Sequence, residues 1–192
     1  MAAQKRLAGP ALAAQAAPLP RAHFSFMLTA MLTSLIFSAV VPAPFGAMGV
    51  RTDSGLVREL VYLPSSHALL DPADDLAEQV ARQLQRYFDD PGFRFDLPLQ
   101  AAGTPFQQKV WSAISAIPPG RVRTYGDIAR LLGSAPRAVG QACGANWFPL
   151  AVPCHRVTAV GGLGGFANSA DADGFHLRVK RWLLAHEGVE DY

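Results

Sequence analysis

Between residues 35 and 63, short apolar runs alternate with turn residues. The runs are rich in Val, Ile, Phe and Tyr, and they are separated by Pro, Gly and an Asp-Ser-Gly break. This pattern is typical of strands joined by tight turns, because each run is long enough for one strand and each break suits a chain reversal. The segment therefore predicts two or three strands that form a meander.

A helical period replaces this alternation after residue 70. Apolar residues recur three or four positions apart, so that they share one face of a helix. These residues are Leu76, Val80, Leu84 and Tyr87 or Phe88. We expect Asp71 to cap this helix and Pro72 to occupy its first position, where the N–H that proline lacks would have no partner. The strands and the helix together predict a small α/β unit over residues 36–98.

The pattern from residue 99 onward is mainly helical. Thr104 and Pro105 have the residue types of a helix cap and a first helical position, and an apolar stripe follows them. The stripe consists of Phe106, Val110, Ile114 and Ile117. A last helix is expected from about Gly174 to Glu187, with Asp173 as its cap.

Two shorter helices lie between these, separated by the sequence Ser-Ala-Pro. The first opens with Thr124 and Asp127, which form a weak capping box, and it closes on Gly133. The second starts at Arg137 and is full of small residues. A helix, a short turn and a second helix form the pattern of a helix-turn-helix, although most such pairs are simple helical hairpins. The pattern alone leaves both interpretations open.

Residues 1–35 precede the predicted α/β unit. The first 23 residues are rich in Ala and Pro and show no apolar period, which is typical of a disordered extension. Residues 24–41 then carry no charge over 18 positions, which suits a membrane span, a signal-peptide core or a buried strand. We favour a buried strand for the later part of this run, because export would conflict with the chemistry expected further along the chain.

Composition and charge bear on the kind of partner. Half of the 192 residues are apolar and 17% are charged, as in a globular protein with a core. The net charge is only +2, but residues 100–165 hold six basic residues and one acidic residue, a local charge of +5. This concentration is typical of a surface that contacts a phosphate backbone, and a solvated basic face is the alternative. The basic residues are Lys109, Arg121, Arg123, Arg130, Arg137 and Arg156.

The two cysteines are too few for a disulfide framework and have no zinc-ligand spacing. Cys143 lies among the small residues of the second predicted helix of the pair, where we expect it to be a small helix residue. Cys154 stands between a proline and His155, so it is either a buried thiol or a nucleophile with an imidazole base beside it. Such a base needs an orienting group, and Glu187 near the chain end is the candidate. From these residues alone the buried thiol is the simpler interpretation.

Longer motifs around Cys154 favour the nucleophile. The sequence PCHRV follows RAVGQACGAN and precedes KRWLLAHEG, and GTPFQQKVWSAISAIPPGRVRTYGDIARLLG lies upstream. Together these motifs resemble the O6-alkylguanine-DNA alkyltransferases, which are the methylated-DNA–protein-cysteine methyltransferases. The resemblance is close over residues 103–188 and looser over residues 36–98. It implies a ribonuclease-H-like α/β domain at 36–98 and a mainly α DNA-binding alkyltransferase domain with a helix-turn-helix at 99–192.

The resemblance implies direct-reversal DNA repair in a single-use reaction. The alkyl group of O6-alkylguanine, with O4-alkylthymine as a further candidate, would move irreversibly to Cys154. Glu187 would orient His155, and His155 would deprotonate the thiol through a water. Tyr125 would stabilise the departing guanine at N3. Asn146 would bridge the helix pair to the active-site turn.

DNA recognition is implied by the same resemblance. A lesion inside a duplex must be flipped out of the base stack before it can react. The second helix of the pair would lie in the minor groove, where Ala138 and Gly140 permit close approach and Arg137 fills the gap left by the flipped base. Further DNA contacts are expected from Thr124, Gln141 and Arg156.

A pocket for the alkylated base is also implied, and its sequence departs from the usual family pattern. Trp147 replaces a proline, Phe166 replaces a tyrosine, and about seven extra residues lie between Phe166 and Lys180. The main-chain carbonyls of Cys154 and Val157 would accept from the guanine amine. The residues expected to line the pocket are Trp147, Pro149, Val157, Phe166 and Ala167.

No cofactor and no metal is expected, since the chain lacks the N-terminal cysteines that bind zinc in some relatives. The implied partner is double-stranded DNA containing O6-alkylguanine, bound in the cytoplasm by a monomer without a stable protein partner. Two alternatives remain: a non-catalytic binder of the alkyltransferase-like type, and a cysteine hydrolase on a small α/β scaffold.

We predict that DNA affinity falls steeply with salt, because each phosphate contact releases counterions. Neutralising about five phosphates should weaken binding at least about a hundredfold between about 50 and 200 mM salt. Fluorescence anisotropy with a labelled duplex measures this change. An affinity that does not vary with salt would contradict a DNA-binding role for the basic residues.

Overall fold

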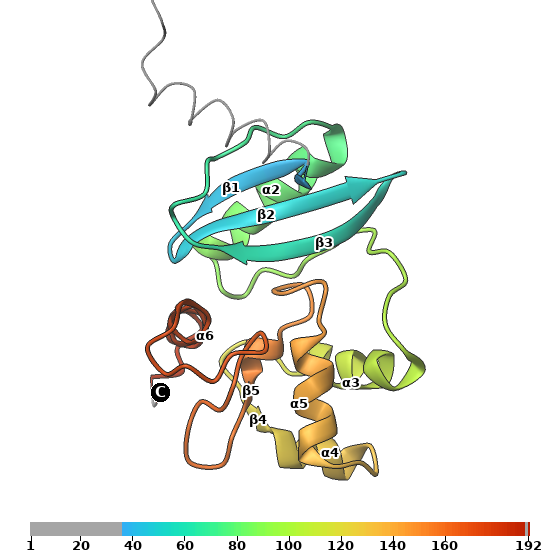
Figure 1. The fold of residues 1–192 in the computed structure, drawn as a ribbon, viewed down its shortest axis with the longest axis vertical. Coiled ribbons are helices and arrows are strands. Elements are labelled where there is room, and N and C mark those ends of the chain that lie inside the picture. Colours follow the sequence, from blue (N-terminus) through green and yellow to red (C-terminus); the bar gives the residue numbers. More distant parts are fainter. Residues whose placement is uncertain (1–35, 191) are drawn as a thin grey trace, which may run out of the picture.

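The computed structural model describes residues 36–190 and 192, and it begins with a three-stranded antiparallel sheet (Figure 1). Its strands are β1 (Ala39–Ala43), β2 (Gly46–Asp53) and β3 (Leu56–Leu63), in the order β1-β2-β3. Ser54 and Gly55, at the β2–β3 turn, have φ of 51° and 75°. Two successive left-handed residues match the twist of a tight hairpin, which explains the Asp-Ser-Gly break. The expected meander is therefore confirmed.

Helix α2 (Asp75–Asp89) packs across this sheet (Figure 1). The helix begins later than expected, because Asp74 rather than Asp71 is its N-cap. An Asp74 oxygen accepts from the backbone N–H of Ala77 at 2.8 Å, and its other oxygen accepts from Thr52 Oγ1 at 2.6 Å. The cap is thus also a tie to β2. The buried face consists of Ala77, Val80, Leu84, Tyr87 and Phe88.

The remainder of the chain is mainly helical, as expected. The elements are α3 (Pro105–Ser115), β4 (Arg123–Thr124), α4 (Tyr125–Leu131), α5 (Pro136–Gly144), the 3-10 turn η1 (Cys154–Arg156), β5 (Val157–Thr158) and α6 (Phe175–His186). Capping boxes at Thr104 and Thr124 begin α3 and α4. The sequence predicted the cap at Thr104 and the capping box at Thr124. Strands β4 and β5 pair in parallel, which brings the start of α4 beside η1.

Helices α5 and α6 begin where the sequence pattern did not place them. Helix α5 starts at Pro136 rather than Arg137, since proline suits a first helical position. The N-cap of α6 is Gly174 and makes no side-chain capping bond. The expected cap, Asp173, instead donates its backbone N–H to Asp171 Oδ1 at 3.2 Å in the preceding turn.

A connection between the two parts covers the outer edge of β3. Val57 donates to the carbonyl of Pro98 at 2.8 Å and accepts from Gln100 at 3.0 Å. Further along the strand, the Leu60 N–H donates to the carbonyl of Trp147 at 2.9 Å. The sheet is therefore joined to the helical part by backbone hydrogen bonds.

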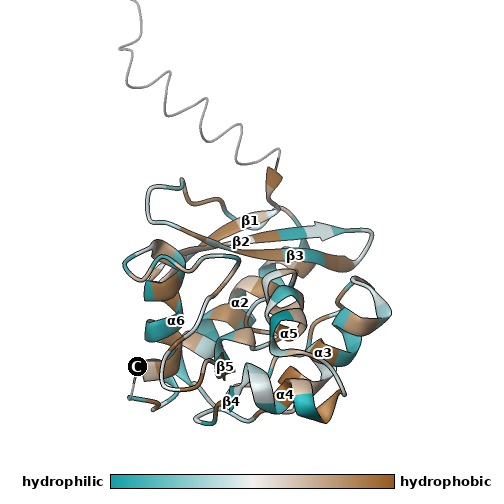
Figure 2. Ribbon diagram, turned by 60° about the horizontal axis from the view of Figure 1, so that its bottom comes forward, coloured by the Kyte–Doolittle hydropathy of each residue, from teal (hydrophilic) through white to brown (hydrophobic). Residues whose placement is uncertain are grey.

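The buried residues of both parts form one main cluster. Apolar residues gather where the sheet and the helices meet, whereas polar residues of α4 and α6 lie on the outer surface (Figure 2). The later part of the apolar run 24–41 contributes Ala39 and Val40 to β1, both almost fully buried. Its earlier part, and the expected extension 1–35, lie outside the described residues. None of the helices described for residues 36–190 is long and apolar enough to cross a membrane.

We predict that Asp74→Ala destabilises the protein by about 1 kcal/mol, because an orphaned N–H at the start of α2 loses its acceptor. The matched control is Asp71→Ala, an exposed position where the change should stay within about 0.5 kcal/mol. Urea unfolding followed by circular dichroism measures both. Equal losses in the two variants would contradict the assignment of Asp74 as the cap.

Candidate active site

A strained turn leads into η1. Leu150 has a φ of 74°, which is costly for a branched side chain, yet Leu150 is almost fully buried. Pro149 and Val152 form a bridge across the turn, and Pro153 precedes the first residue of η1. Strain of this kind persists only where the surrounding structure holds the backbone in place. The turn that contains Leu150 leads to Cys154, the first residue of η1.

Asn146 organises this turn from the end of α5. Its Nδ2 donates to the carbonyl of Val152 at 2.8 Å and to Cys154 Sγ at 3.3 Å. Its Oδ1 accepts from the backbone N–H of Phe148 at 2.9 Å. The side chain therefore connects the helix to the turn, as expected, and also contacts the sulfur.

His155 and Glu187 meet in the interior. Nε2 of His155 lies 2.9 Å from Glu187 Oε1, and both side chains are fully buried. Nδ1 of His155 is buried and has no hydrogen-bond partner within the described part of the chain. The imidazole is thus held at one nitrogen by a carboxylate, while the other nitrogen is available for proton transfer.

The Glu187 carboxylate collects further donors from distant segments. Arg156 donates through Nε to Oε2 and through Nη2 to Oε1, both at 2.9 Å. Tyr87 of α2 donates its hydroxyl to Oε1 at 2.8 Å, and the Gly120 N–H donates to Oε2 at 3.4 Å. Each donor stabilises the charged form, so this carboxylate stays ionised despite its burial.

The pKa values follow from these contacts. Burial alone would raise the pKa of Glu187, but the hydrogen bonds from His155 and Arg156 outweigh it and hold the pKa at about 2. Burial lowers the pKa of His155 although Glu187 acts in the opposite direction, so the imidazole is neutral and able to accept a proton. Burial raises the pKa of Cys154, and the Asn146 hydrogen bond and the Lys180 charge oppose this shift.

Arg156 was expected to contact DNA, and the structure corrects this expectation. The residue is 7% exposed, and its guanidinium also donates to the carbonyl of Ile117 at 2.6 Å. A buried arginine that is paired with Glu187 is not on the basic surface, because breaking the pair would leave a buried carboxylate without its counter-charge. The other five basic residues of the 100–165 segment are exposed: Lys109, Arg121, Arg123, Arg130 and Arg137.

Lys180 of α6 is a functional candidate that the sequence pattern did not single out. Its Nζ donates to the carbonyls of Val157, Leu163 and Gly165 at 2.7, 2.7 and 3.2 Å. The ammonium also lies 5.7 Å from the ring centroids of Tyr125 and Phe166. Burial lowers the pKa of Lys180 to about 8. In the sequence, the sign of this role was a lysine on the face of α6 that is otherwise apolar and buried.

An open groove of about 690 Å³ runs between α5 and the loop before α6. Arg137, Gly140, Gln141 and Tyr125, all expected at the DNA interface or active site, line it. The Tyr125 hydroxyl donates to the carbonyl of Gly165 at 2.7 Å and is therefore held against the loop. Ala138 is half-buried beside these residues, and Thr124 caps α4 through its hydroxyl.

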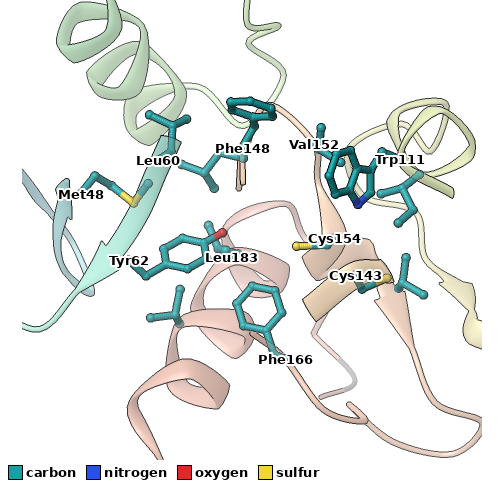
Figure 3. Packing of buried hydrophobic residues seen from close by; sticks show 14 of the residues in the cluster. Met48, Leu60, Tyr62, Trp111, Cys143, Phe148, Val152, Cys154, Phe166 and Leu183 are labelled. Atoms are coloured by element: carbon teal, nitrogen blue, oxygen red, sulfur yellow. The ribbon is translucent and has the colours of Figure 1, made fainter. Parts of the chain in front are cut away.

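Behind the groove lies a small cavity of about 130 Å³. The two spaces share four lining residues: Cys143, Gly144, Phe166 and Ala167. Cys154 and Pro149 also line the cavity, which therefore receives the sulfur. Figure 3 shows Cys154, Phe166 and Cys143 around this space.

Two expected pocket residues do not line the cavity. Trp147 lies on the surface with 45% exposure. Its backbone carbonyl binds to Leu60 of β3, whereas its ring stays outside. Val157 is fully buried, and its carbonyl accepts from Lys180. A larger cavity of about 810 Å³ between α3 and α4 contains neither Cys154 nor His155, so size alone does not identify the site.

The loop before α6 is fastened to α5. Asn168 Nδ2 donates to the carbonyl of Gly144 at 2.9 Å. A Cβ on Gly144 would lie only 2.0 Å from Asn168 Oδ1, so any larger residue there would displace the Asn168 side chain from this contact. Ala167 and Asn168 have φ of 48° and 60°, a tight local turn that sets Ala167 over the cavity.

Within the described residues, no group of three or more His, Cys, Asp and Glu side chains is arranged to hold a metal ion. The carboxylate of Glu187 contacts the imidazole of His155 and also accepts from Arg156, Tyr87 and Gly120. The chemistry suggested by this arrangement is that of a buried thiol, a neutral imidazole and an ionised carboxylate, beside a groove for an extended ligand.

Comparison with known proteins gives a consistent assignment. The family described as "6-O-methylguanine DNA methyltransferase, DNA binding domain" matches residues 105–189. The constitutive methylated-DNA–protein-cysteine methyltransferase of Bacillus subtilis is 49% identical over 111 residues, which are 56% of this chain and 67% of the relative. The methylated-DNA–protein-cysteine methyltransferase of Methanosarcina acetivorans is 33% identical, over 80% of this chain and 99% of the relative.

Solved structures agree with these relatives. The crystal structure of O6-methylguanine methyltransferase from Mycobacterium tuberculosis is 36% identical, with a TM-score of 0.63 over 77% of this chain and 90% of that one. A structure of the Mycobacterium tuberculosis protein in complex with DNA matches with 35% identity and a TM-score of 0.63, over 79% of this chain and 92% of that one.

We predict that Glu187→Gln lowers stability by about 3 kcal/mol near neutral pH, because Arg156 loses its buried counter-charge. The pKa of about 2 in the folded protein lies below the ordinary 4.5, so the stabilisation from Glu187 is complete above pH 4.5 and is lost as the pH falls toward 2. The difference between wild type and variant should therefore shrink in acid.

Urea unfolding at about pH 6 and about pH 3 measures this difference. The exposed Glu190→Gln serves as the control, with little effect at either pH. A difference for Glu187→Gln that stays constant between the two pH values would contradict the buried, ionised carboxylate.

Proposed function

The chain belongs to the methylated-DNA–protein-cysteine methyltransferase family, and from this premise we propose which of its residues carry the reaction. It is an O6-methylguanine-DNA methyltransferase, which repairs DNA by direct reversal through transfer of the methyl group to a cysteine. We assign the acceptor role to Cys154, with His155 as its base and Glu187 as the group that orients the base.

One observation carries this assignment. Cys154 is the thiol at the head of η1, it lines the small cavity behind the groove, and the next residue is an imidazole held by a buried carboxylate. Cys143 lines the same cavity, and burial raises the pKa of both thiols, but Asn146 contacts Cys154 rather than Cys143. The contacts therefore favour Cys154 as the nucleophile.

The proton moves first. Nδ1 of His155 takes the proton of Cys154 through a bridging water, and Glu187 stabilises the imidazolium that forms. Asn146 donates to the sulfur and so favours the thiolate as it develops. In the resting protein the imidazole is neutral and the carboxylate is ionised. The imidazole can therefore accept the thiol proton, and the carboxylate can stabilise the charge that results.

The alkyl group moves second, by in-line displacement. The sulfur forms a bond to the alkyl carbon, the bond from that carbon to guanine O6 breaks, and its electron pair goes to the guanine. We assign to Tyr125 the hydrogen bond that stabilises the departing base at N3, after its hydroxyl leaves the carbonyl of Gly165. The product is a thioether, which falls outside the reversible thiol modifications, so each molecule acts once.

DNA binding positions the lesion for this reaction. We place α5 in the minor groove with Arg137 filling the gap of a flipped-out nucleotide. The exposure of Arg137 and Gln141, and the small Gly140 on the groove side of α5, support this placement. The four further exposed basic residues supply charge for phosphate contacts.

We propose that the protein acts as a monomer on double-stranded DNA containing O6-alkylguanine, without a cofactor and in the cytoplasm. Within this proposal residues 36–98 form the α/β domain and residues 99–192 the alkyltransferase domain. Its reaction requires a compartment that contains DNA.

We predict that incubation with a duplex containing O6-methylguanine adds one methyl group to the peptide that contains Cys154, and none to the peptide that contains Cys143. Mass spectrometry of the digested protein measures this. Cys154→Ala should lose at least about 99% of the transfer, since no other activated thiol is present in the cavity, and should keep its affinity for the duplex.

The same experiment separates the alternatives. Binding without a change in mass would indicate a non-catalytic binder of alkylated DNA. Removal of the lesion by Cys154→Ala would contradict the assigned acceptor.

A further inference from the structure

The hydroxyl of Tyr62 is buried without a hydrogen-bond partner among residues 36–190. Tyr62 is 7% exposed, and its ring lies 5.5 Å from the rings of Phe45 and Phe166, measured between centroids. An unpaired buried hydroxyl costs free energy, and a phenylalanine would fill the same space without that cost. The surroundings of the hydroxyl therefore indicate what it could bind.

Tyr62 faces the cavity that receives the Cys154 sulfur. Both residues line the space of about 130 Å³ behind the open groove. Figure 3 shows the Tyr62 hydroxyl pointing away from the sheet, on the side of its ring that faces Cys154. The groove lies on the α5 side of this cavity, and β3 forms the opposite wall through residues 59–62.

The hydroxyl is a donor under all ordinary conditions. Burial, and secondarily the nearby Cys154, raise the pKa of Tyr62 well above its usual value of 10.0. A phenol that keeps its proton can donate to an acceptor that enters the cavity, because its O–H rotates freely. Its own wall offers no acceptor that it reaches.

The proposed reaction determines which atoms enter this space. In an in-line displacement the sulfur, the alkyl carbon and guanine O6 lie on one line, so any further atoms on that carbon point sideways to the walls. A methyl group presents only hydrogens there. A two-carbon substituent that ends in oxygen extends across a cavity of this size, which has room for about four water-sized groups.

Resting on the proposed function, we propose that Tyr62 is a specificity-determining residue that donates a hydrogen bond to a neutral oxygen on the transferred group. The substrate class is O6-(hydroxyalkyl)guanine, with the 2-hydroxyethyl adduct as its simplest member. A neutral group fits better than a carboxylate, because the wall holds no lysine or arginine. Its other polar side chains, besides the two thiols, are Asn146, whose amide already contacts the Cys154 sulfur, Glu59, which is ion-paired with Arg51 at 2.7 Å, and the half-buried His176.

The test compares two substituents of nearly equal size, 2-hydroxyethyl and propyl, on guanine O6 in the same duplex. Single-turnover transfer to the full-length protein should be about tenfold faster for hydroxyethyl than for propyl, because propyl leaves the Tyr62 donor unpaired. In Tyr62→Phe the ratio should fall to about one, while transfer of methyl changes by less than about twofold, since methyl does not reach residue 62.

The matched control is Tyr192→Phe. This change removes a hydroxyl that lies 3.1 Å from Thr158 Oγ1 and does not line the cavity, so the wild-type ratio should persist. The thermal midpoint of Tyr62→Phe should equal or exceed that of wild type, because the variant removes an unpaired polar group from the core.

Each remaining outcome counts against the inference. If Tyr62→Phe slows methyl, propyl and hydroxyethyl transfer equally, the hydroxyl has a structural role only. If wild type transfers all three groups but shows the same ratio as Tyr62→Phe, the specificity is absent while the proposed function stands. If wild type transfers none of them, the proposed function and this inference fall together.

Discussion

The ionised carboxylate of Glu187, enclosed by the protein, is the constraint on which the active site depends. A buried charge without partners is prohibitively costly, so the fold must deliver donors to both oxygens. They come from η1, from α2 and from the loop before α4, while the carboxylate itself ends α6. Segments up to 100 residues apart in sequence must therefore be in place together before His155 is correctly oriented. Through the Tyr87 hydroxyl, the N-terminal α/β part therefore supplies one of the donors that hold Glu187.

The same enclosure sets the reactivity of the sulfur. Burial raises the pKa of Cys154 and keeps it a thiol, which is a weak nucleophile. The groups that oppose this shift, Asn146 and Lys180, are fixed by their other hydrogen bonds and do not depend on a ligand. In the proposed reaction an accidental alkylation of Cys154 would be irreversible, so a thiol that stays shielded until a lesion enters the cavity suits a protein that reacts once. Shielding and activation are thus supplied by one arrangement of side chains.

Local patterns in the sequence predicted those parts of the structure that depend on neighbouring residues. The Asp-Ser-Gly turn, the capping boxes at Thr104 and Thr124, and the apolar stripes of α2 and α3 all follow from residue type and spacing. The start of α2 was wrong because Thr52, far away in sequence, selects Asp74 over Asp71 as the cap. For the proposed active site, the motifs around Cys154 predicted that Glu187 orients His155, and the two side chains are in contact in the structure.

The residues that surround these three could not be predicted in the same way. Arg156 looked like a surface cation, because its partner Glu187 is 31 residues away in sequence. Tyr87 belonged to the predicted helical stripe and Tyr62 to the predicted strands. A hydrophobic period records which side chains are buried and not where a hydroxyl points. Lys180 interrupts an apolar stripe, and that interruption was the one local sign that a buried charge is required there.

The backbone bonds that Val57 makes with Pro98 and Gln100 have a consequence for how the molecule associates with other chains. An uncovered outer strand offers a row of free amides to any other extended chain and so promotes fibrous association. Here the linker pairs with the outer edge of β3 at Val57, and the carbonyl of Trp147 accepts from the next outward-facing amide, that of Leu60. Proteolytic nicking of that linker would bare the strand, so the intact connection protects the molecule from self-association as well as joining its halves.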